Sequence, residues 1–357
     1  MSDLKRHIMA RIAAEGPLSV ADYMTECLLH PTLGYYTTRD PFGAAGDFIT
    51  APEISQMFGE MVGLCLAQSW LDQGAPSPCV LAELGPGRGT LMADILRATR
   101  SLPGFHDAVQ VHLVEASPAL RARQAATLDG LLPADRITWH DRTESLPELP
   151  LLLIANEFFD ALPIRQFIRD GAGWSERRIG IKDGKLQFGR SAPSAQDSLA
   201  HRLDDTSEGD LVEVCPAAGP IMQVLADRIE THGGAALVVD YGDWRSLGDT
   251  WQALRGHAPC DPLDAPGTAD LTAHVDFEAL LTGLACAHSR VTPQGVFLER
   301  LGITARAQAL AAKLDGAALD AHIAAHRRLT HPQEMGTLFK VVALFPSAGN
   351  PPPGLEI

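Results

Sequence analysis

A short segment near residue 85 constrains the fold of this chain more than any other feature. The apolar run Val80–Leu84 leads into Gly-Pro-Gly-Arg-Gly at 85–89, and a helical pattern begins at Thr90. Glycine is used where a backbone turns sharply or lets a ligand approach closely. In an open parallel sheet, the first turn from strand to helix is where nucleotide-like ligands bind. The spacing G-x-G-x-G differs from the G-x-G-x-x-G of dinucleotide-binding enzymes.

Strand and helix patterns alternate after residue 76, which predicts an α/β fold. The segment Leu151–Ala155 is apolar throughout, as expected for a strand buried on both faces. Repeated units of this kind predict a Rossmann-like, mostly parallel, doubly wound sheet. The predicted strands are Val80–Leu84, Val109–Glu115, Ile137–His140, Leu151–Ala155, Ala235–Tyr241 and Thr337–Phe345, with Gly295–Leu298 as another short strand.

The segments outside this alternation predict a helical cap, an insertion and a tail. Helical patterns cover residues 3–15, a segment capped by Ser19, and a segment from Pro52 to about Asp72. Residues 164–214 interrupt the alternation with three β segments, a pattern typical of a β-meander. We therefore predict a helical N-terminal cap region (1–75), a core domain (76–346) that carries the insertion, and a disordered tail (347–357).

The charge balance is acidic and narrows the choice of partners. The chain of 357 residues has 29 Lys and Arg against 44 Asp and Glu, a net charge of −15, which argues against non-specific binding to nucleic acid. Six cysteines are scattered without a C-x-x-C pair, which favours buried thiols over a disulfide or zinc framework. No signal-type segment begins the chain, and no apolar run reaches the roughly 18 residues of a membrane span. We expect a cytoplasmic protein without a membrane span or a metal site.

Two further polar segments carry candidate reactive residues. Ala-Asn-Glu-Phe-Phe-Asp at 155–160 follows the buried fourth strand. Its two acids beside two phenylalanines suit a cationic amine or a guanidinium, which a carboxylate pairs with through two oxygens. The alternative is local, because Asn156 also suits the cap of a helix with acids in its first turn. The segment Gly46–Gln56 is predicted to close over the site, although Thr50 and Glu53 also fit a capping box.

Together these segments resemble the MidA-like methyltransferases, a family that includes a mitochondrial complex I assembly factor acting as a protein arginine methyltransferase. The most specific matches are Asn-Glu-Phe-Phe-Asp-Ala-Leu-Pro at 156–163 and Gly-Asp-Phe-Ile-Thr-Ala-Pro-Glu at 46–53. The resemblance implies a class I methyltransferase fold, a seven-stranded sheet whose last strand is antiparallel, and S-adenosyl-L-methionine as cofactor. It also implies methyl transfer to an arginine nitrogen of a protein, with a respiratory complex I subunit as the target.

Acidic residues at the ends of the predicted strands are the candidates for binding this cofactor. Glu83 is expected to accept from the ammonium of the methionine moiety, unless it only caps the glycine turn. Glu115 is expected to accept from the ribose hydroxyls, unless it is an ordinary acid at the end of a strand, and Asp141 is expected to accept from the adenine amino group. The predicted cofactor-binding residues are Glu83, Gly85, Pro86, Gly87, Glu115, Asp141 and Asn156.

Glu157, Asp160 and His274 are the predicted catalytic residues. The two acids are expected to orient a guanidinium, and His274 to act as a base or substrate contact, although a lone histidine is more often structural. Two other classes stay open at this point. An NAD(P)-dependent oxidoreductase needs G-x-G-x-x-G, whereas Thr90 follows the third glycine. A non-catalytic assembly factor would keep the fold and bind the cofactor without turnover. The expected partner is a protein that presents an arginine.

Overall fold

The computed structural model describes residues 2–38 and 50–357, which form two compact units. Of the described residues, the meander unit comprises 2–38, 160–219 and 243–280, and the parallel-sheet unit comprises 50–159, 220–242 and 281–357. Each unit therefore combines stretches that are distant in sequence. In the described ranges, no helix has both the length and the apolar character needed to cross a membrane.

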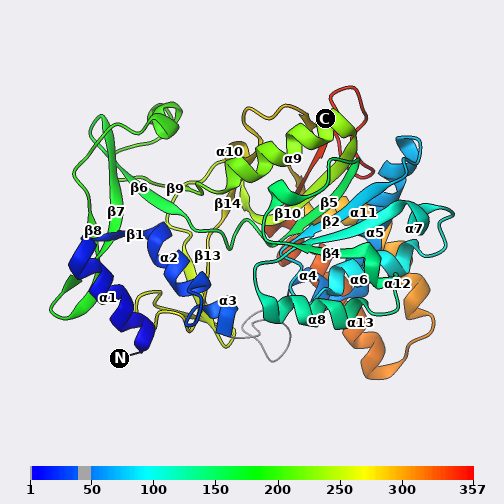
Figure 1. Cartoon of the computed structure of the whole chain (residues 1–357), viewed down its shortest axis with the longest axis horizontal. Helices are drawn as coiled ribbons and strands as arrows, with labels where there is room; N and C mark the ends of the chain where they lie inside the picture. Colours follow the sequence, from blue (N-terminus) through cyan, green and yellow to red (C-terminus); the bar gives the residue numbers. More distant parts are fainter. Residues whose placement is uncertain (1, 39–49) are drawn as a thin grey trace. The chain divides into compact units, whose positions relative to one another are not determined.

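The parallel-sheet unit is built around one long sheet. Its strands are β2 (Cys79–Leu84), β3 (Val109–Val114), β4 (Ile137–His140), β5 (Leu151–Asn156), β10 (Gly234–Asp243), β15 (Ala287–His288), β16 (Thr292–Pro293) and β17 (Phe339–Phe345). The order is β15-β17-β10-β5-β2-β3-β4, with β16 also paired to β17. Figure 1 labels β10, β5, β2 and β4 of this sheet. The strands from β10 to β4 are parallel, whereas β17 is antiparallel to β10. This is the class I methyltransferase sheet predicted from the sequence.

Helices cover both faces of this sheet. They are α4 (Ala51–Ile54), α5 (Gln56–Asp72), α6 (Thr90–Thr99), α7 (Phe105–Ala108), α8 (Pro118–Leu128), α9 (Ala218–His232), α11 (Gln294–Arg300), α12 (Ile303–Ala311), α13 (Gly316–Thr330) and α14 (Met335–Leu338). Figure 1 shows α9 on the side of the sheet opposite α6 and α8. Every residue of β2 and β5 is buried, which explains why these strands are apolar without alternation.

The meander unit contains the predicted insertion and the first helices of the chain. Its helices are α1 (Asp3–Glu15), α2 (Val20–Leu29), α3 (Tyr35–Thr38) and α10 (Phe277–Leu281). Its strands are β1 (Leu18–Ser19), β6 (Arg165–Asp170), β7 (Gly173–Lys182), β8 (Lys185–Arg190), β9 (Leu211–Val214), β11 (Gln252–Arg255), β12 (Ala258–Cys260), β13 (Asp270–Thr272) and β14 (Val275–Asp276). The β-meander is present as β6, β7 and β8, and Ser19 caps α2 as predicted, accepting from the Asp22 N–H at 3.0 Å.

The predicted N-terminal cap region does not form one compact body. The pairing of β1 with β7 ties α1 and α2 to the meander unit, whereas α4 and α5 belong to the parallel-sheet unit. The single helix predicted from Pro52 is also wrong. The chain is extended at Ser55, with φ −161°, and its hydroxyl accepts from the Met57 N–H at the start of α5. The Ser55 cap therefore divides the apolar pattern that we predicted as one helix into α4 and α5.

The C-terminal part departs from the predictions at two places. The predicted strand Gly295–Leu298 is wrong, because these residues lie in α11. A Cβ at Gly295 would lie 2.3 Å from the Thr330 carbonyl oxygen, so glycine lets α11 approach the end of α13. The tail 347–357 is not disordered. Leu355 is buried in the core of the parallel-sheet unit, and the Glu356 carbonyl accepts from the Arg290 N–H at 2.8 Å.

Gly234 provides a test of the β5–β10 pairing. It has φ +112°, and a Cβ there would lie 2.0 Å from the carbonyl oxygen of Leu151. Because the neighbour is backbone, we expect Gly234→Ala to lower the free energy of unfolding by more than about 3 kcal/mol, the upper end of typical single-residue effects. Denaturant unfolding measures the change.

Gly130→Ala is the matched control for that experiment. Gly130 has a similar left-handed φ of +73° but no atom within 4 Å of a Cβ. This variant carries only the conformational cost, on the order of 1 kcal/mol. Equal losses in the two variants would contradict the proposed backbone collision.

Candidate functional site

The glycine turn between β2 and α6 has the geometry expected of a ligand-binding loop. Gly85, Gly87 and Gly89 have φ values of +60°, +50° and +80°, which favour glycine. Gly85 is exposed, and a Cβ there would lie 2.9 Å from the ring of Phe158. Pro86 is buried, and its carbonyl accepts from the Gly89 N–H at 2.7 Å. Gly85 is thus the exposed backbone of this turn, just before the N-terminus of α6, and a ligand can approach the turn at this residue.

Two buried acceptors lie at the ends of adjacent strands. Glu83 of β2 is 3% exposed, and its Oε2 has no hydrogen-bond partner among the described residues. Asn156 of β5 is 8% exposed, and its Oδ1 likewise has no partner in the part of the chain that the structure describes. Because β2 and β5 are parallel neighbours, both residues lie near the same end of the sheet. Buried polar atoms are normally hydrogen-bonded, so this pair fits a ligand that brings donors, such as the ammonium of a methionine moiety.

Burial also sets the protonation of Glu83. Burial is the main cause that raises the pKa of this carboxyl to about 8; the nearby acids Asp94 and Glu115 contribute to the rise, and the backbone N–H of Met92 opposes it. In the absence of a cation, the carboxyl is therefore mainly protonated at neutral pH. A bound ammonium group would favour its charged form.

A second predicted cofactor residue, Glu115, is held by a network that the sequence did not reveal. Its Oε1 accepts from the Ser117 N–H at 2.8 Å, and its Oε2 from the Gln124 amide at 3.2 Å. Gln124 is fully buried in α8, donates to the Gly87 carbonyl at 2.8 Å and accepts from the Trp139 indole at 2.9 Å. One amide therefore joins the glycine turn to the acid expected to bind ribose.

The sequence contains a helical pattern that marks Gln124, although we predicted no role for this residue. The buried residues of α8 recur every four positions, at Leu120, Gln124 and Leu128. An amide on the apolar stripe of a helix must find polar partners inside the protein. That requirement marks Gln124 as a residue that positions its neighbours.

The structure does not bring Asp141 into this buried network. Its side chain is 80% exposed and forms an ion pair with Arg121. Arg121 in turn donates through Nε to the Glu115 carbonyl at 2.7 Å. Contact of Asp141 with an adenine amino group stays a prediction, and it requires a ligand edge that reaches the surface beside Arg121.

Glu157 adopts a conformation that is unusual for a residue with a side chain. Its φ is +51°, in the left-handed region, a state that costs on the order of 1–3 kcal/mol and is common at functional sites. Its Oε1 accepts from the Ala51 N–H at 3.0 Å and from the Asn156 amide at 3.1 Å. Residues 157–163 form turns rather than a helix, so the alternative of a capped helix at this position is wrong.

The segment before α5 contacts the glycine turn. Thr50 makes no side-chain cap, so the predicted capping box with Glu53 is absent. Glu53 instead accepts from the Thr90 hydroxyl at 2.6 Å and lies 4.0 Å from Arg88. Residues 46–49 of the predicted closing segment lie outside the described residues.

Asp160 and His274 belong to the meander unit. Asp160 is 5% exposed, and its carbonyl accepts from the N–H of Ala273 at 3.0 Å. The next residue, His274, donates its backbone N–H to Thr250 at 2.8 Å. The structure therefore brings these two predicted residues onto adjacent backbone segments.

Two residues that we had not assigned lie near Asp160. The Tyr36 hydroxyl donates to Asp270 at 2.7 Å. Burial raises the pKa of Tyr36, and the charges of Asp270 and Asp160 raise it further, so the three groups lie close together. Tyr36 and Asp270 are 234 residues apart in the chain, so no local sequence pattern links them.

Glu83 gives a pH-dependent prediction for the ligand-free protein. The pKa of Glu83 in the folded protein, about 8, lies above the usual value of 4.5. The stability that the protonated carboxyl contributes is therefore full below pH 4.5 and is lost as the pH rises through 8. We expect Glu83→Gln to gain stability relative to the native chain over this range, by on the order of a few kcal/mol at pH 9. Thermal unfolding from pH 5 to pH 9 measures this difference, with exposed Glu148→Gln as control. Parallel curves for Glu83→Gln and the native chain would contradict it.

Known proteins are similar to this chain over nearly its whole length. The protein arginine methyltransferase NDUFAF7, mitochondrial, of Danio rerio is 40% identical, with 96% of this chain and 87% of the relative covered. The human protein of the same name is 38% identical, with 97% and 84% covered. A crystal structure of a Burkholderia thailandensis protein bound to S-adenosyl-homocysteine has a TM-score of 0.83 and 31% identity, with 98% and 94% covered.

These relatives contradict our prediction of the cellular compartment and distinguish between the function classes that the sequence left open. Their names place them in mitochondria, which contradicts our expectation of a cytoplasmic protein. They do not favour the NAD(P)-dependent oxidoreductase or the non-catalytic factor. The cofactor is S-adenosyl-L-methionine, as predicted.

The model of a family described as S-adenosyl-L-methionine-dependent methyltransferases matches residues 61–296. With the fold and its relatives, this match shows that the chain belongs to the MidA-like family of S-adenosyl-L-methionine-dependent methyltransferases.

Proposed function

We propose that this enzyme methylates an arginine guanidinium nitrogen of a protein. The observation that carries the proposal is the carboxylate of Glu157, which directly follows β5 in a left-handed conformation. Two donors, the Ala51 N–H and the Asn156 amide, orient it. A fixed carboxylate suits a guanidinium because their two planar groups pair with defined geometry. The names of the relatives, which are protein arginine methyltransferases, support the same substrate class.

The cofactor is assigned to the end of the parallel sheet. Glu83 and Asn156 would accept from its ammonium, the backbone of Gly85 and Gly87 would lie against it, and Glu115 would accept from its ribose hydroxyls. When bound, S-adenosyl-L-methionine supplies an electrophilic methyl group. The protein then contributes mainly positioning and the exclusion of water.

The substrate is assigned to Glu157, Asp160 and His274. In the reaction, a guanidinium nitrogen gains a methyl group and loses a proton. Glu157 and Asp160 would hold the guanidinium so that one nitrogen is directed at the methyl group, and their charges would stabilise the cation. His274 is a candidate acceptor of the proton or a further substrate contact.

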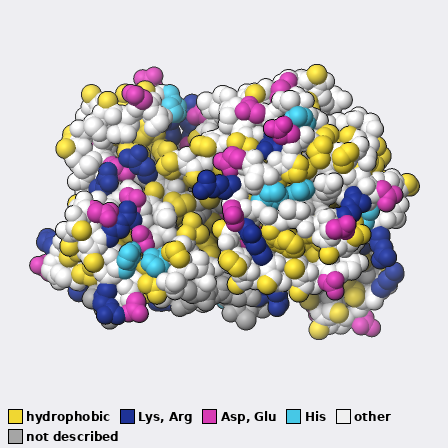
Figure 2. Space-filling model, viewed as in Figure 1, with side chains coloured by type: hydrophobic (Ala, Val, Ile, Leu, Met, Phe, Trp, Pro, Cys, Tyr) yellow, Lys and Arg dark blue, Asp and Glu magenta, His cyan; other side chains and the backbone are white. Residues whose placement is uncertain are grey.

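The partner that fits this activity is a protein with an accessible arginine. The family resemblance supports a subunit of respiratory complex I as the target, and a role in the assembly of that complex. On the face drawn in Figure 2, Lys and Arg side chains are interspersed with Asp and Glu. This mixture suits a protein partner better than the phosphate backbone of a nucleic acid.

The ribose assignment predicts the effect of replacing Glu115. In Glu115→Ala the ribose hydroxyls lose a charged acceptor, and such hydrogen bonds contribute about 1.5–3 kcal/mol. Cofactor affinity should therefore fall by roughly tenfold to a hundredfold. Calorimetry with S-adenosyl-homocysteine measures the dissociation constant. Asp141→Asn is the comparison, because its exposed side chain should contribute less. An unchanged constant in Glu115→Ala would leave Glu115 with a structural role as the partner of Ser117 and Gln124.

The catalytic assignment predicts the effect of replacing Glu157. Glu157→Gln keeps an oxygen for the Ala51 and Asn156 donors but removes the charge. Methyl transfer should fall by at least about a hundredfold, as for the loss of one preorganised electrostatic partner, with cofactor affinity nearly unchanged. Asp160→Asn should have a similar or smaller effect.

Transfer of labelled methyl from S-adenosyl-L-methionine measures this activity, in a lysate of the native host that lacks this protein. The exposed Glu148→Gln is the charge-matched control. Normal turnover per folded molecule combined with a lower unfolding temperature would show that the acids are structural. Cofactor binding by the native chain without transfer to any host protein would contradict the proposed function.

A further inference from the structure

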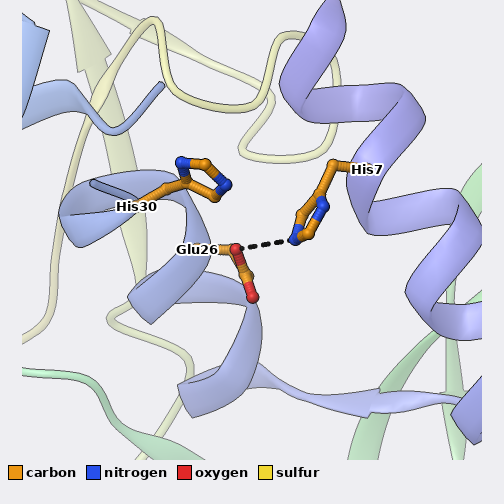
Figure 3. Close-up of side chains that lie close together, drawn as sticks. All are labelled: His7, Glu26 and His30. Atoms are coloured by element: carbon orange, nitrogen blue, oxygen red, sulfur yellow. Dashed lines mark ion pairs between the residues drawn. The ribbon is translucent and has the colours of Figure 1, made fainter. Parts of the chain in front are cut away.

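A cluster of metal-ligand side chains lies in the meander unit, on the first two helices. It comprises His7 of α1, Glu26 of α2 and His30, which caps the end of α2. The ligand atoms of the three all lie within 4.8 Å of one another. Figure 3 shows the two imidazole rings directed toward the carboxylate, with His7 Nε2 3.3 Å from Glu26 Oε2. This cluster has no role in the proposed methyl transfer.

The helices place these side chains together independently of any ion. Glu26 and His30 are four residues apart, so they lie on the same face of α2. His7 adjoins Ile8, which is fully buried in the same apolar core as Met24 and Leu28 of α2. The packing of α1 against α2 therefore fixes the backbone of all three residues. A preformed arrangement reduces the ordering that a ligand would otherwise impose.

The surroundings of the cluster also suit a cation. Arg11 donates to Glu26 Oε1 at 2.9 Å, which leaves Oε2 directed at His7. Ligating carboxylates are commonly held in this way by an outer partner. Arg11 also pairs with Glu15 at 2.9 Å and lies 3.7 Å from Asp22. Three carboxylates thus surround one guanidinium, and the local charge is negative.

We propose that His7, Glu26 and His30 bind one Zn²⁺ ion. Two imidazoles and one carboxylate are an established ligand set for zinc, with water completing a four-coordinate site. Bond lengths of about 2.0–2.2 Å require the ligand atoms to draw closer. His7 is able to adjust because its side chain is 46% exposed.

Zinc binding would change the hydrogen bond that the His30 ring makes with Thr32. Its Nδ1 accepts from the Thr32 N–H at 3.3 Å, and Figure 3 shows the other nitrogen directed toward His7 and Glu26. Zinc on Nε2 places the ring proton on Nδ1, so the long contact with Thr32 is released. The ion would replace it with a link between α1 and α2, and would thereby stabilise the first helix of the chain.

Titration of tag-free, metal-stripped protein with Zn²⁺ tests this site. Calorimetry should show one ion per chain with a dissociation constant in the micromolar range or tighter. His7→Ala, Glu26→Gln and His30→Ala should each weaken binding by at least about tenfold, or 1.4 kcal/mol. His201→Ala, which removes an exposed histidine of the same unit, should bind as the native chain does.

A second measurement separates loss of binding from loss of folding. Zinc should raise the unfolding temperature of the native chain and of His201→Ala, each compared with its own metal-free state. The three ligand variants should show little or no such shift. Absence of binding below millimolar Zn²⁺ would overturn the proposal. Binding that survives in both His7→Ala and His30→Ala would overturn it as well.

Discussion

The pairing of β2 with β5 is the constraint on which the cofactor site depends. Both strands are buried along their whole length, so their side chains cannot reach water and their apolar sequence fixes them in the centre of the sheet. Because they are parallel neighbours, their last residues meet at one edge. Glu83 and Asn156 are the polar exceptions at that edge. Their buried oxygens are costly in isolation, and a cationic ligand would compensate for that cost.

A second constraint acts on the loop after β5. Glu157 is held in a left-handed conformation by the Val239 carbonyl, which accepts from its backbone N–H at 2.9 Å, and by the two donors to its side chain. Asp240, which is fully buried, accepts from the Phe159 N–H at 2.9 Å. The end of β10 therefore determines the shape of the loop after β5. Residues held in this way can present a carboxylate with little freedom to move.

The sequence was sufficient for those features that depend on local patterns. The glycine turn, the buried strands, the β-meander and the Ser19 cap each have a signature within a few residues. The division at Ser55, the helical state of Gly295–Leu298 and the packing of Leu355 depend on contacts between distant segments, which a local pattern does not contain. For the same reason, the pair of Tyr36 with Asp270 became recognisable only once the helices and strands were placed, whereas the apolar stripe of α8 already marked Gln124. The cytoplasmic prediction failed because it rested on the lack of a signal, whereas the relatives are mitochondrial proteins.

The position of β17 has a consequence for how the chain acquires its structure during synthesis. This strand pairs with β10 along six residues, yet about a hundred residues separate the two in sequence. The contacts of Leu355 and Glu356 are made later still. Until the ribosome has released β17, the edge of β10 that pairs with it lacks this partner and presents unpaired backbone groups. Exposed edges of this kind invite association with other chains. The nascent protein is therefore expected to depend on protection of that edge until β17 emerges.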